Sequence, residues 1–145
     1  MQFQNWGALG EKVIALDNSR LVVSRLLLCS QEAAWQVITD TEQWPYWGPS
    51  VSRVRCAQRY IQLGSTGSVR TVFGFWVPFS INRYQHLHFW SWRIGRFEAT
   101  GHRLAITEDG FCRISFDMPW WAFPYVLICA IALRRISRLL EAGQA

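Results

Sequence analysis

The stretch from Pro119 to Glu141 constrains the fold most, because it is the one long segment with a clear helical pattern. From Trp120 to Leu133 it contains fourteen residues without a charge, and a membrane span needs about 20 apolar residues. The length therefore favours a buried core helix. Asp117 and Pro119 are suitable start signals, and the arginines near its end complement the negative end of the helix dipole.

Apolar residues recur along this segment at three- and four-residue spacing, which places them on one side of a helix. They are Cys129, Ala132, Ile136, Leu139 and Leu140, whereas Arg134, Arg138 and Glu141 occupy another side. Such a helix has a wide apolar surface to cover. The strands that precede it are the candidates for that cover.

The composition is that of a folded protein, and 145 residues are most simply one domain. We expect an N-terminal arm over residues 1–19 and a single domain over residues 20–145. The chain is 50% hydrophobic and 15% aromatic, with nine Trp and nine Phe. Two interpretations stay open for this aromatic content: a bulky core, or rings that line a cavity or an exposed patch.

The net charge of +5 invites a nucleic-acid partner, but the basic residues are spread along the chain. Only Arg134, Arg135 and Arg138 cluster, and a solvated helix end accounts for them. We therefore expect no nucleic-acid partner, while an anionic lipid or an acidic partner stays an alternative. The N-terminus lacks the basic start and apolar run of a signal peptide, so we expect a cytoplasmic protein.

The four cysteines lie far apart, each in an apolar or strand-like context, and form no CxxC pair: Cys29, Cys56, Cys112 and Cys129. They are interpreted as reduced core residues rather than as a disulfide or zinc set. His86 and His88 alternate on one strand with His102 nearby, but no acidic residue or Cys stands beside them at a ligand spacing. We expect no metal and no cofactor.

Turn residues at short intervals after Pro49 indicate an antiparallel sheet. One strand at Arg20–Leu28 and a helix at Gln31–Asp40 come before it, with one further helical turn at Glu42–Trp44 and an aromatic plug of Trp44, Tyr46 and Trp47. The later strands are expected at Val51–Tyr60, Ser68–Phe73, Phe79–Tyr84, His88–Ile94, Thr100–Thr107 and Phe111–Asp117. In the arm, Trp6, Leu9, Val13 and Leu16 are spaced as a short helical face.

Four segments carry a family resemblance: Ala34–Val51 (AWQVITDTEQWPYWGPSV), Trp90–Arg93 (WSWR), Thr100–His102 (TGH) and the hairpin at Gly110. With the order of elements, they resemble the polyketide cyclase/dehydrase branch of the START-like superfamily, also called SRPBCC. The resemblance covers residues 20–141. It implies an α+β helix-grip fold of the Bet v 1/START-like type, in which a seven-stranded antiparallel sheet curls around the C-terminal helix and leaves an apolar cavity. The superfamily holds lipid carriers, hormone-binding proteins and cyclases, so the resemblance implies no single function.

The resemblance places His102 at the start of a strand whose inward face also holds Leu104 and Ile106. Strand alternation and the helix stripe assign the rest of the cavity walls. We expect the walls to comprise Trp90, Trp92, His102, Leu104, Ile106, Ile114, Phe116, Cys129 and Ile136. The cavity rim is expected at Phe75 and Trp76, in a tip over Gly74–Pro78, and at Trp120 and Trp121, because a plain turn has no use for large apolar groups.

Two functional hypotheses follow, and a third is weaker. The first is a binding protein for an apolar or aromatic small molecule, with His102 as one polar anchor. The alternative is a cyclase or dehydratase of polyketide-like substrates that uses His102 as general acid/base, with Arg70 or Arg93 steadying an enolate. The third is a weak membrane or protein contact through Phe75 and Trp76. No oligomeric state is predicted. Gly64–Gly67 lacks the Lys of a phosphate loop, and no serine has nucleophile-elbow spacing.

Overall fold

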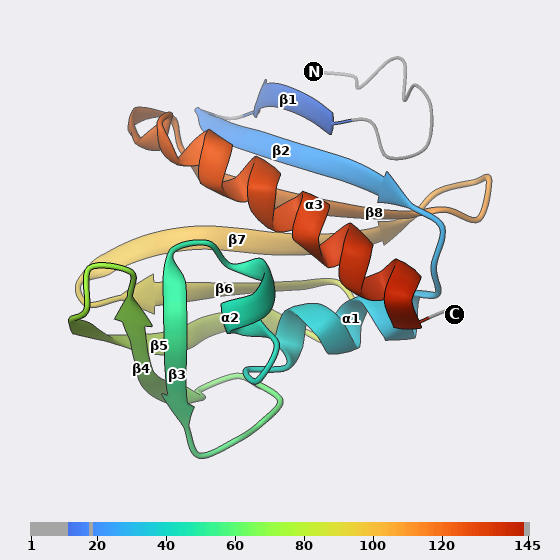
Figure 1. The fold of residues 1–145 in the computed structure, drawn as a ribbon. Coiled ribbons are helices and arrows are strands. Elements are labelled where there is room, and N and C mark those ends of the chain that lie inside the picture. Colours follow the sequence, from blue (N-terminus) through green and yellow to red (C-terminus); the bar gives the residue numbers. More distant parts are fainter. Residues whose placement is uncertain (1–11, 18, 144–145) are drawn as a thin grey trace.

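The computed structural model describes residues 12–17 and 19–143, which form one antiparallel sheet with helices packed on one face (Figure 1). The strands of this part of the chain lie in the order β1-β2-β8-β7-β6-β5-β4-β3. The elements are β1 (Lys12–Asp17), β2 (Arg20–Leu27), α1 (Gln31–Thr39), α2 (Trp44–Trp47), β3 (Val51–Cys56), β4 (Thr66–Thr71), β5 (Trp76–Gln85), β6 (Phe89–Ile94), β7 (Phe97–Ile106), β8 (Cys112–Pro119), the 3₁₀ helix η1 (Trp120–Ala122) and α3 (Tyr125–Gly143).

The long helix α3 crosses the sheet on the face that also carries α1 and α2, and it contacts β2 and both short helices. Strands β3 to β8 follow one another as a meander, and β8 then pairs with β2. The chain therefore leaves the sheet after β2, forms α1 and α2, and re-enters at the opposite edge. The seven predicted strands and the C-terminal helix are confirmed, and the α+β arrangement is consistent with a helix-grip fold.

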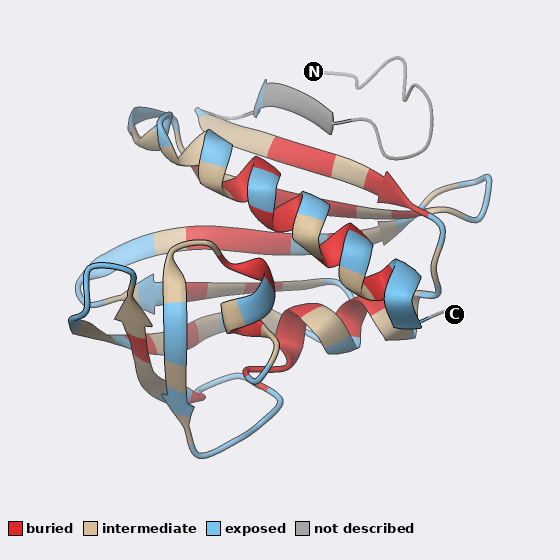
Figure 2. Ribbon diagram, in the orientation of Figure 1, coloured by how far each residue is buried: buried red, intermediate tan, exposed pale blue. Residues whose placement is uncertain are grey.

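The core lies where α3 meets the sheet, and Figure 2 shows buried residues on the facing sides of both. Every second residue of β8 from Cys112 to Met118 is buried, as an inward face requires. On α3 the predicted stripe is buried at Cys129, Ala132, Ile136 and Leu140, while the charged residues of its other side are exposed. Burying one such Leu or Ile contributes about 1.5–3 kcal/mol.

The start of α3 differs from the prediction. The helix begins at Tyr125 instead of directly after Pro119, and Trp120–Ala122 form a separate 3₁₀ turn. Pro124 explains the difference, because a residue without an N–H is tolerated only in the first turn of a helix. Asp117 is no start signal either, since it lies on β8 and accepts a hydrogen bond from Arg20 Nε at 2.6 Å.

Two further expectations are corrected. Strand β5 begins at Trp76, so the tip of that hairpin is the turn at 72–75 and Trp76 belongs to the strand. The N-terminal arm contributes β1, which pairs along β2 as an eighth strand, so the helical interpretation is wrong for Val13 and Leu16. Trp6 and Leu9 lie outside the described residues.

A chain that ends at Met118 tests the dependence of the sheet on α3. It should show no cooperative thermal transition by circular dichroism, because the inward faces of β2 and β8 would lose their apolar cover. The full chain in the same buffer is the control. A shortened chain that still melts sharply would contradict the architecture.

Candidate functional site

A small cavity lies between α2, α3 and strands β6 to β8, with a volume of about 30 Å³. Aromatic rings make up much of its wall. Its lining residues are Trp44, Trp47, Gly48, Pro49, Ser50, Val51, Trp90, Trp92, Thr100, His102, Phe116, Tyr125, Ile128, Cys129 and Ala132. A space of this size holds one or two water molecules, so the rings themselves fill most of the interior.

The centre of the wall is a stack of three rings. Trp90 lies parallel to Trp44 at 5.4 Å between ring centroids and parallel to His102 at 3.7 Å. Trp92 and Phe116 meet this stack edge-on. Such offset and edge-to-face pairs each contribute about 0.5–1.5 kcal/mol beyond the burial of area, so the wall is rigid.

His102 is held by a chain of hydrogen bonds. Trp92 Nε1 donates to Thr100 Oγ1 at 3.0 Å, which leaves the Thr100 hydroxyl to donate to His102 Nε2 at 3.3 Å. The other ring nitrogen, Nδ1, donates to the carbonyl oxygen of Trp90 at 3.3 Å, and this assigns the neutral tautomer with its proton on Nδ1. Burial lowers the pKa of His102 to about 3, against a smaller opposite effect of the Trp90 carbonyl. The imidazole is therefore neutral at ordinary pH and a weak proton acceptor.

The indole of Trp90 carries a hydrogen-bond donor that no described residue accepts. Its side chain is fully buried, and Nε1 has no hydrogen-bond partner among the described residues. A buried N–H without a partner costs about 1–3 kcal/mol, which a ligand oxygen or a bound water would recover.

An open apolar groove of about 350 Å³ adjoins the cavity at the end of the sheet. Trp92, Thr100 and Tyr125 line both spaces, so the two share a wall. The other lining residues are Ile94, Phe97, Glu98, Ala99, Met118, Pro119, Trp121 and Ala122. The Tyr125 hydroxyl is 2.7 Å from the Ser50 hydroxyl, and this hydrogen bond ties the start of α3 to the loop after α2.

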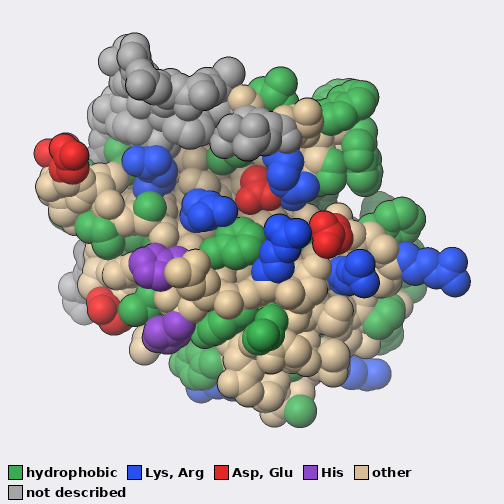
Figure 3. Space-filling model, turned by 180° about the vertical axis from the view of Figure 1, so that it is seen from behind, with side chains coloured by type: hydrophobic (Ala, Val, Ile, Leu, Met, Phe, Trp, Pro, Cys, Tyr) green, Lys and Arg blue, Asp and Glu red, His purple; other side chains and the backbone are tan. Residues whose placement is uncertain are grey.

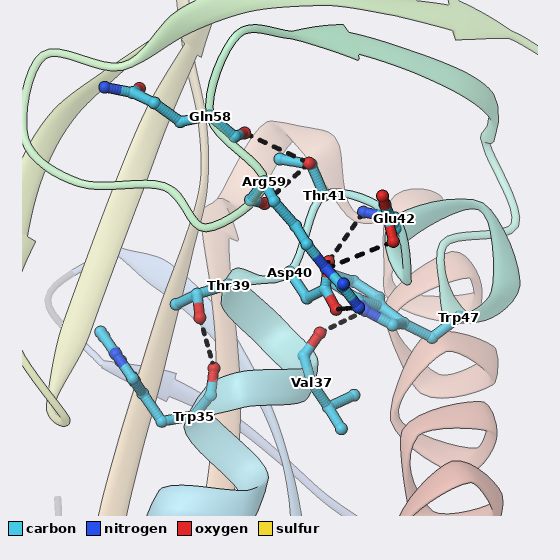
Figure 4. A network of polar contacts seen from close by, with 9 residues as sticks. All are labelled: Trp35, Val37, Thr39, Asp40, Thr41, Glu42, Trp47, Gln58 and Arg59. Carbon is cyan, nitrogen blue, oxygen red and sulfur yellow. Dashed lines mark hydrogen bonds and ion pairs between the residues drawn. The ribbon is translucent and has the colours of Figure 1, made fainter.

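The loop between α1 and α2 sets the position of Trp44 and Trp47. Asp40 is buried and accepts from Arg59 Nε and Nη2 at 3.1 and 3.0 Å, and from the backbone N–H of Glu42 at 3.0 Å (Figure 4). The indole of Trp47 donates to the Val37 carbonyl at 3.1 Å, which anchors the ring on the end of α1. A buried carboxylate with all these partners fixes the loop, and the loop delivers the two rings into the cavity wall.

The structure gathers some of the predicted wall residues and not others. Trp90, Trp92, His102, Phe116 and Cys129 line the cavity. Three more are buried in the core but are not among its lining residues: Leu104, Ile114 and Ile136. Ile106 is wrongly assigned, because it is the last residue of β7 and is 49% exposed.

The predicted rim is also divided. Trp121 lines the groove and Trp120 is exposed beside it. Phe75 lies exposed in the turn at 72–75 and does not line the cavity or the groove, and Trp76 lines a separate polar hollow, where the Arg55 guanidinium lies 4.0 Å from its ring centroid. The rim prediction is therefore wrong for both Phe75 and Trp76.

The prediction missed several residues of the site. Thr100 stands two residues before His102 on one strand, so alternation alone could have found it. Trp44 and Trp47 were expected only as a plug, and Tyr46 of that plug is 67% exposed instead.

The remaining candidate groups of the described residues are the cysteines and the side chains that could bind a metal. All four cysteines are free, and burial, with a smaller effect of the charge of Asp117, raises the pKa of Cys129 to about 12. A thiol in that state is no nucleophile at neutral pH. Among described side chains, no three His, Cys, Asp or Glu gather as metal ligands. In the same residues no helix is long and apolar enough to cross a bilayer.

Comparisons with known proteins agree on the fold. No protein-family model and no curated protein matches the chain. A conserved protein of unknown function from Enterococcus faecalis is similar in structure, with a TM-score of 0.65 at 13% identity, over 93% of this chain and 80% of that one. A protein from Mycobacterium smegmatis has a TM-score of 0.61 at 18% identity, over 94% of this chain and 99% of that one. A protein from Mesorhizobium loti has a TM-score of 0.66 at 12% identity, over 85% of this chain and 97% of that one. These likenesses establish the fold alone.

His102 predicts a specific pH dependence of stability. The unfolded chain binds a proton at this residue below about pH 6.5, whereas the folded chain does not until about pH 3, so stability falls as the pH drops through this window. Between pH 7 and pH 5 the loss should be about 2 kcal/mol, measured by urea unfolding. His102→Gln should remove this loss, whereas the exposed His88→Gln should retain it. Equal slopes in the two variants would contradict the assignment.

The hydrogen bonds of the loop between α1 and α2 predict that Asp40 and Glu42 contribute very differently to thermal stability. Asp40→Ala should lower the Tm clearly, because it removes the buried acceptor of Arg59 and of the Glu42 N–H. Glu42→Ala should leave the Tm almost unchanged, since Glu42 is exposed and its ion pair with Arg59 lies at the surface. Similar losses in both variants, measured by calorimetry, would show that Asp40 does not fix the loop.

Proposed function

We propose that this protein binds a flat, weakly polar small molecule with an apolar or aromatic body, at the mouth of the space between the sheet and α3. The observation that supports this best is the position of the apolar groove directly beside the aromatic cavity, with Trp92, Thr100 and Tyr125 in the wall of both. As part of the proposal, the chain is a member of the START-like superfamily in its polyketide cyclase/dehydrase branch. The fold and the residues at 34–51 support this membership.

The two spaces suit two parts of one ligand. The groove of about 350 Å³ is in the range of small-molecule sites and takes the body. The cavity of about 30 Å³ takes a single substituent, such as a hydroxyl or carbonyl oxygen. Thr100, and the unused N–H of Trp90, are the groups that would bond to it, while His102 holds Thr100 in place.

The charges in the site favour a neutral ligand. Neither Lys nor Arg is among the residues that line the groove or the cavity. A ligand carboxylate would therefore find no cation in a partly desolvated space. Arg70 and Arg93 do not serve as anchors in this arrangement, since Arg70 donates to the carbonyl of Gly74 and Arg93 is exposed.

The alternative function is a cyclase or dehydratase in which His102 is the general base. The pKa of about 3 makes this imidazole a poor base, and both of its nitrogens already have partners in the wall. Binding is therefore the better-supported function. The aromatic wall serves binding directly, because a ring stacked on Trp92 gains about 0.5–1.5 kcal/mol beyond area burial.

Titration with planar aromatics and with fatty acids, followed by Trp fluorescence, tests the proposal. Neutral planar aromatics should quench the Trp fluorescence saturably, and fatty acids should bind more weakly because neither space offers a cation to their carboxylate. Trp92→Leu should weaken binding, and His102→Ala should lower the affinity by less than about tenfold if the imidazole only anchors. His88→Ala, at an exposed site outside the groove, is the matched control.

Three results would separate the hypotheses. If His102→Ala keeps full affinity but abolishes conversion of a polyketide mimic, the enzyme hypothesis replaces binding. If fatty acids bind better than neutral aromatics, the assignment of the ligand class is wrong. If no compound of the panel binds, the aromatic residues are core and the binding proposal fails.

A further inference from the structure

Large apolar side chains stand exposed around the opening of the groove. This mouth patch consists of Phe97, Trp120, Trp121, Phe123 and Leu127, each between 60% and 71% exposed. Phe97 and Trp121 line the groove itself, and Trp120 precedes Trp121 in η1. Phe123 lies between η1 and α3, and Leu127 lies in the first turn of α3. Clusters of exposed apolar residues of this kind mark interaction surfaces in soluble proteins.

The patch is held in an exposed position by its neighbours. Ala122, Tyr125 and Val126 alternate with it and pack against the core, and Tyr125 is hydrogen-bonded to Ser50. The backbone N–H of Trp120 donates to the Ser19 carbonyl at 3.2 Å, which ties η1 to the turn before β2. With the inward side of the segment occupied, the exposed rings cannot fold into the core.

Unpaired arginines adjoin the patch. Arg96 directly precedes Phe97, and Arg93 lies opposite Glu98 on the neighbouring strand. Both arginines are exposed and make no ion pair with any described residue. Of the nearby acids, Asp117 is paired with Arg20, and Glu98 accepts a hydrogen bond from Asn82. Figure 3 views the molecule from the face of the sheet that the helices do not cover, and basic side chains outnumber acidic ones on that face.

We propose that the mouth patch docks the protein onto an anionic phospholipid surface, with Trp120, Trp121 and Phe123 among the headgroups and Arg93 and Arg96 on lipid phosphates. Charge complementarity selects this occupant. A second copy would bring the same arginines against each other in a protein whose net charge is +5, whereas an anionic leaflet attracts them. Trp at the water–lipid boundary beside Arg is the arrangement of interfacial anchors.

The exposed turn at 72–75 is the comparison surface. Phe73 and Phe75 stack there at 6.3 Å between ring centroids and are exposed, yet they line neither the groove nor the cavity.

Docking through the mouth patch would also let an apolar ligand pass between bilayer and groove without entering water. That consequence rests on the proposed function, but the docking does not.

Sedimentation with sucrose-loaded vesicles tests the docking without any ligand. The full chain should bind vesicles of phosphatidylcholine with about a third phosphatidylserine, bind pure phosphatidylcholine at least about tenfold more weakly, and lose binding as salt is raised. The double variant Trp120→Ser/Trp121→Ser should bind the anionic vesicles at least about tenfold more weakly. Arg93→Gln/Arg96→Gln should weaken binding several-fold.

Three controls locate the surface. Leu63→Ser removes an equally exposed apolar side chain elsewhere, Arg134→Gln/Arg138→Gln removes two exposed arginines of α3, and Phe73→Ser/Phe75→Ser removes the comparison surface. All three should bind as the unchanged protein does. Thermal melts should be alike for every variant, because the altered side chains are exposed.

Several outcomes would overturn the proposal. Absence of binding to anionic vesicles would do so, as would unchanged binding by the Trp double variant. A loss on Phe73→Ser/Phe75→Ser instead would move the contact to the other turn. If light scattering shows a dimer that Trp120→Ser/Trp121→Ser dissolves, then a second copy covers the patch.

Discussion

The stack of Trp44, Trp90 and His102 determines what the interior of this protein can hold. The three rings come from α2, β6 and β7, and their contact brings the loop after α1 down onto the sheet. They occupy the space that a sheet and a helix would otherwise leave between them, so only about 30 Å³ remains. The same packing removes water from His102 and keeps it neutral. Rigidity, the small cavity and the low basicity of the imidazole therefore have one cause.

Because the three rings fill the interior, the space that could hold a ligand lies nearer the surface of the protein. Apolar area is still available where Trp92 and Tyr125 pass from the cavity wall to the groove, and there the polar atoms are few and mostly satisfied. The exception is the N–H of Trp90, which lies within the stack and lacks a partner among the described residues. A site with a broad apolar body and one unused donor selects for a ligand of low polarity that carries one acceptor. Selectivity would come from that single group, since an analogue without the acceptor would leave the donor unpaired.

Local sequence patterns predicted β2 to β8 and α3 well, because period-two and three-to-four spacing report burial directly. They failed where a longer-range contact decides. The pairing of Asp40 with Arg59 joins residues 19 apart and orients Trp44 and Trp47, and no periodicity encodes it. Alternation placed Ile106 inward but could not show that the position at the end of β7 is 49% exposed. Strand β1 depends on the free edge of β2, which is also a tertiary feature.

The prevalence of arginine over lysine suits the lipid headgroup layer that is proposed to surround the mouth patch. Lys12 is the single lysine in the sequence, so fourteen of the fifteen basic residues are arginine. A guanidinium is more weakly hydrated than an ammonium group and binds phosphate oxygens in pairs, so it loses less on entering a headgroup layer. A lysine beside the exposed Trp side chains would attract an anionic surface mainly as a point charge. Beside Arg93 and Arg96, the rings of Trp120 and Trp121 would be held at a defined depth, and the groove that they border would face the lipid.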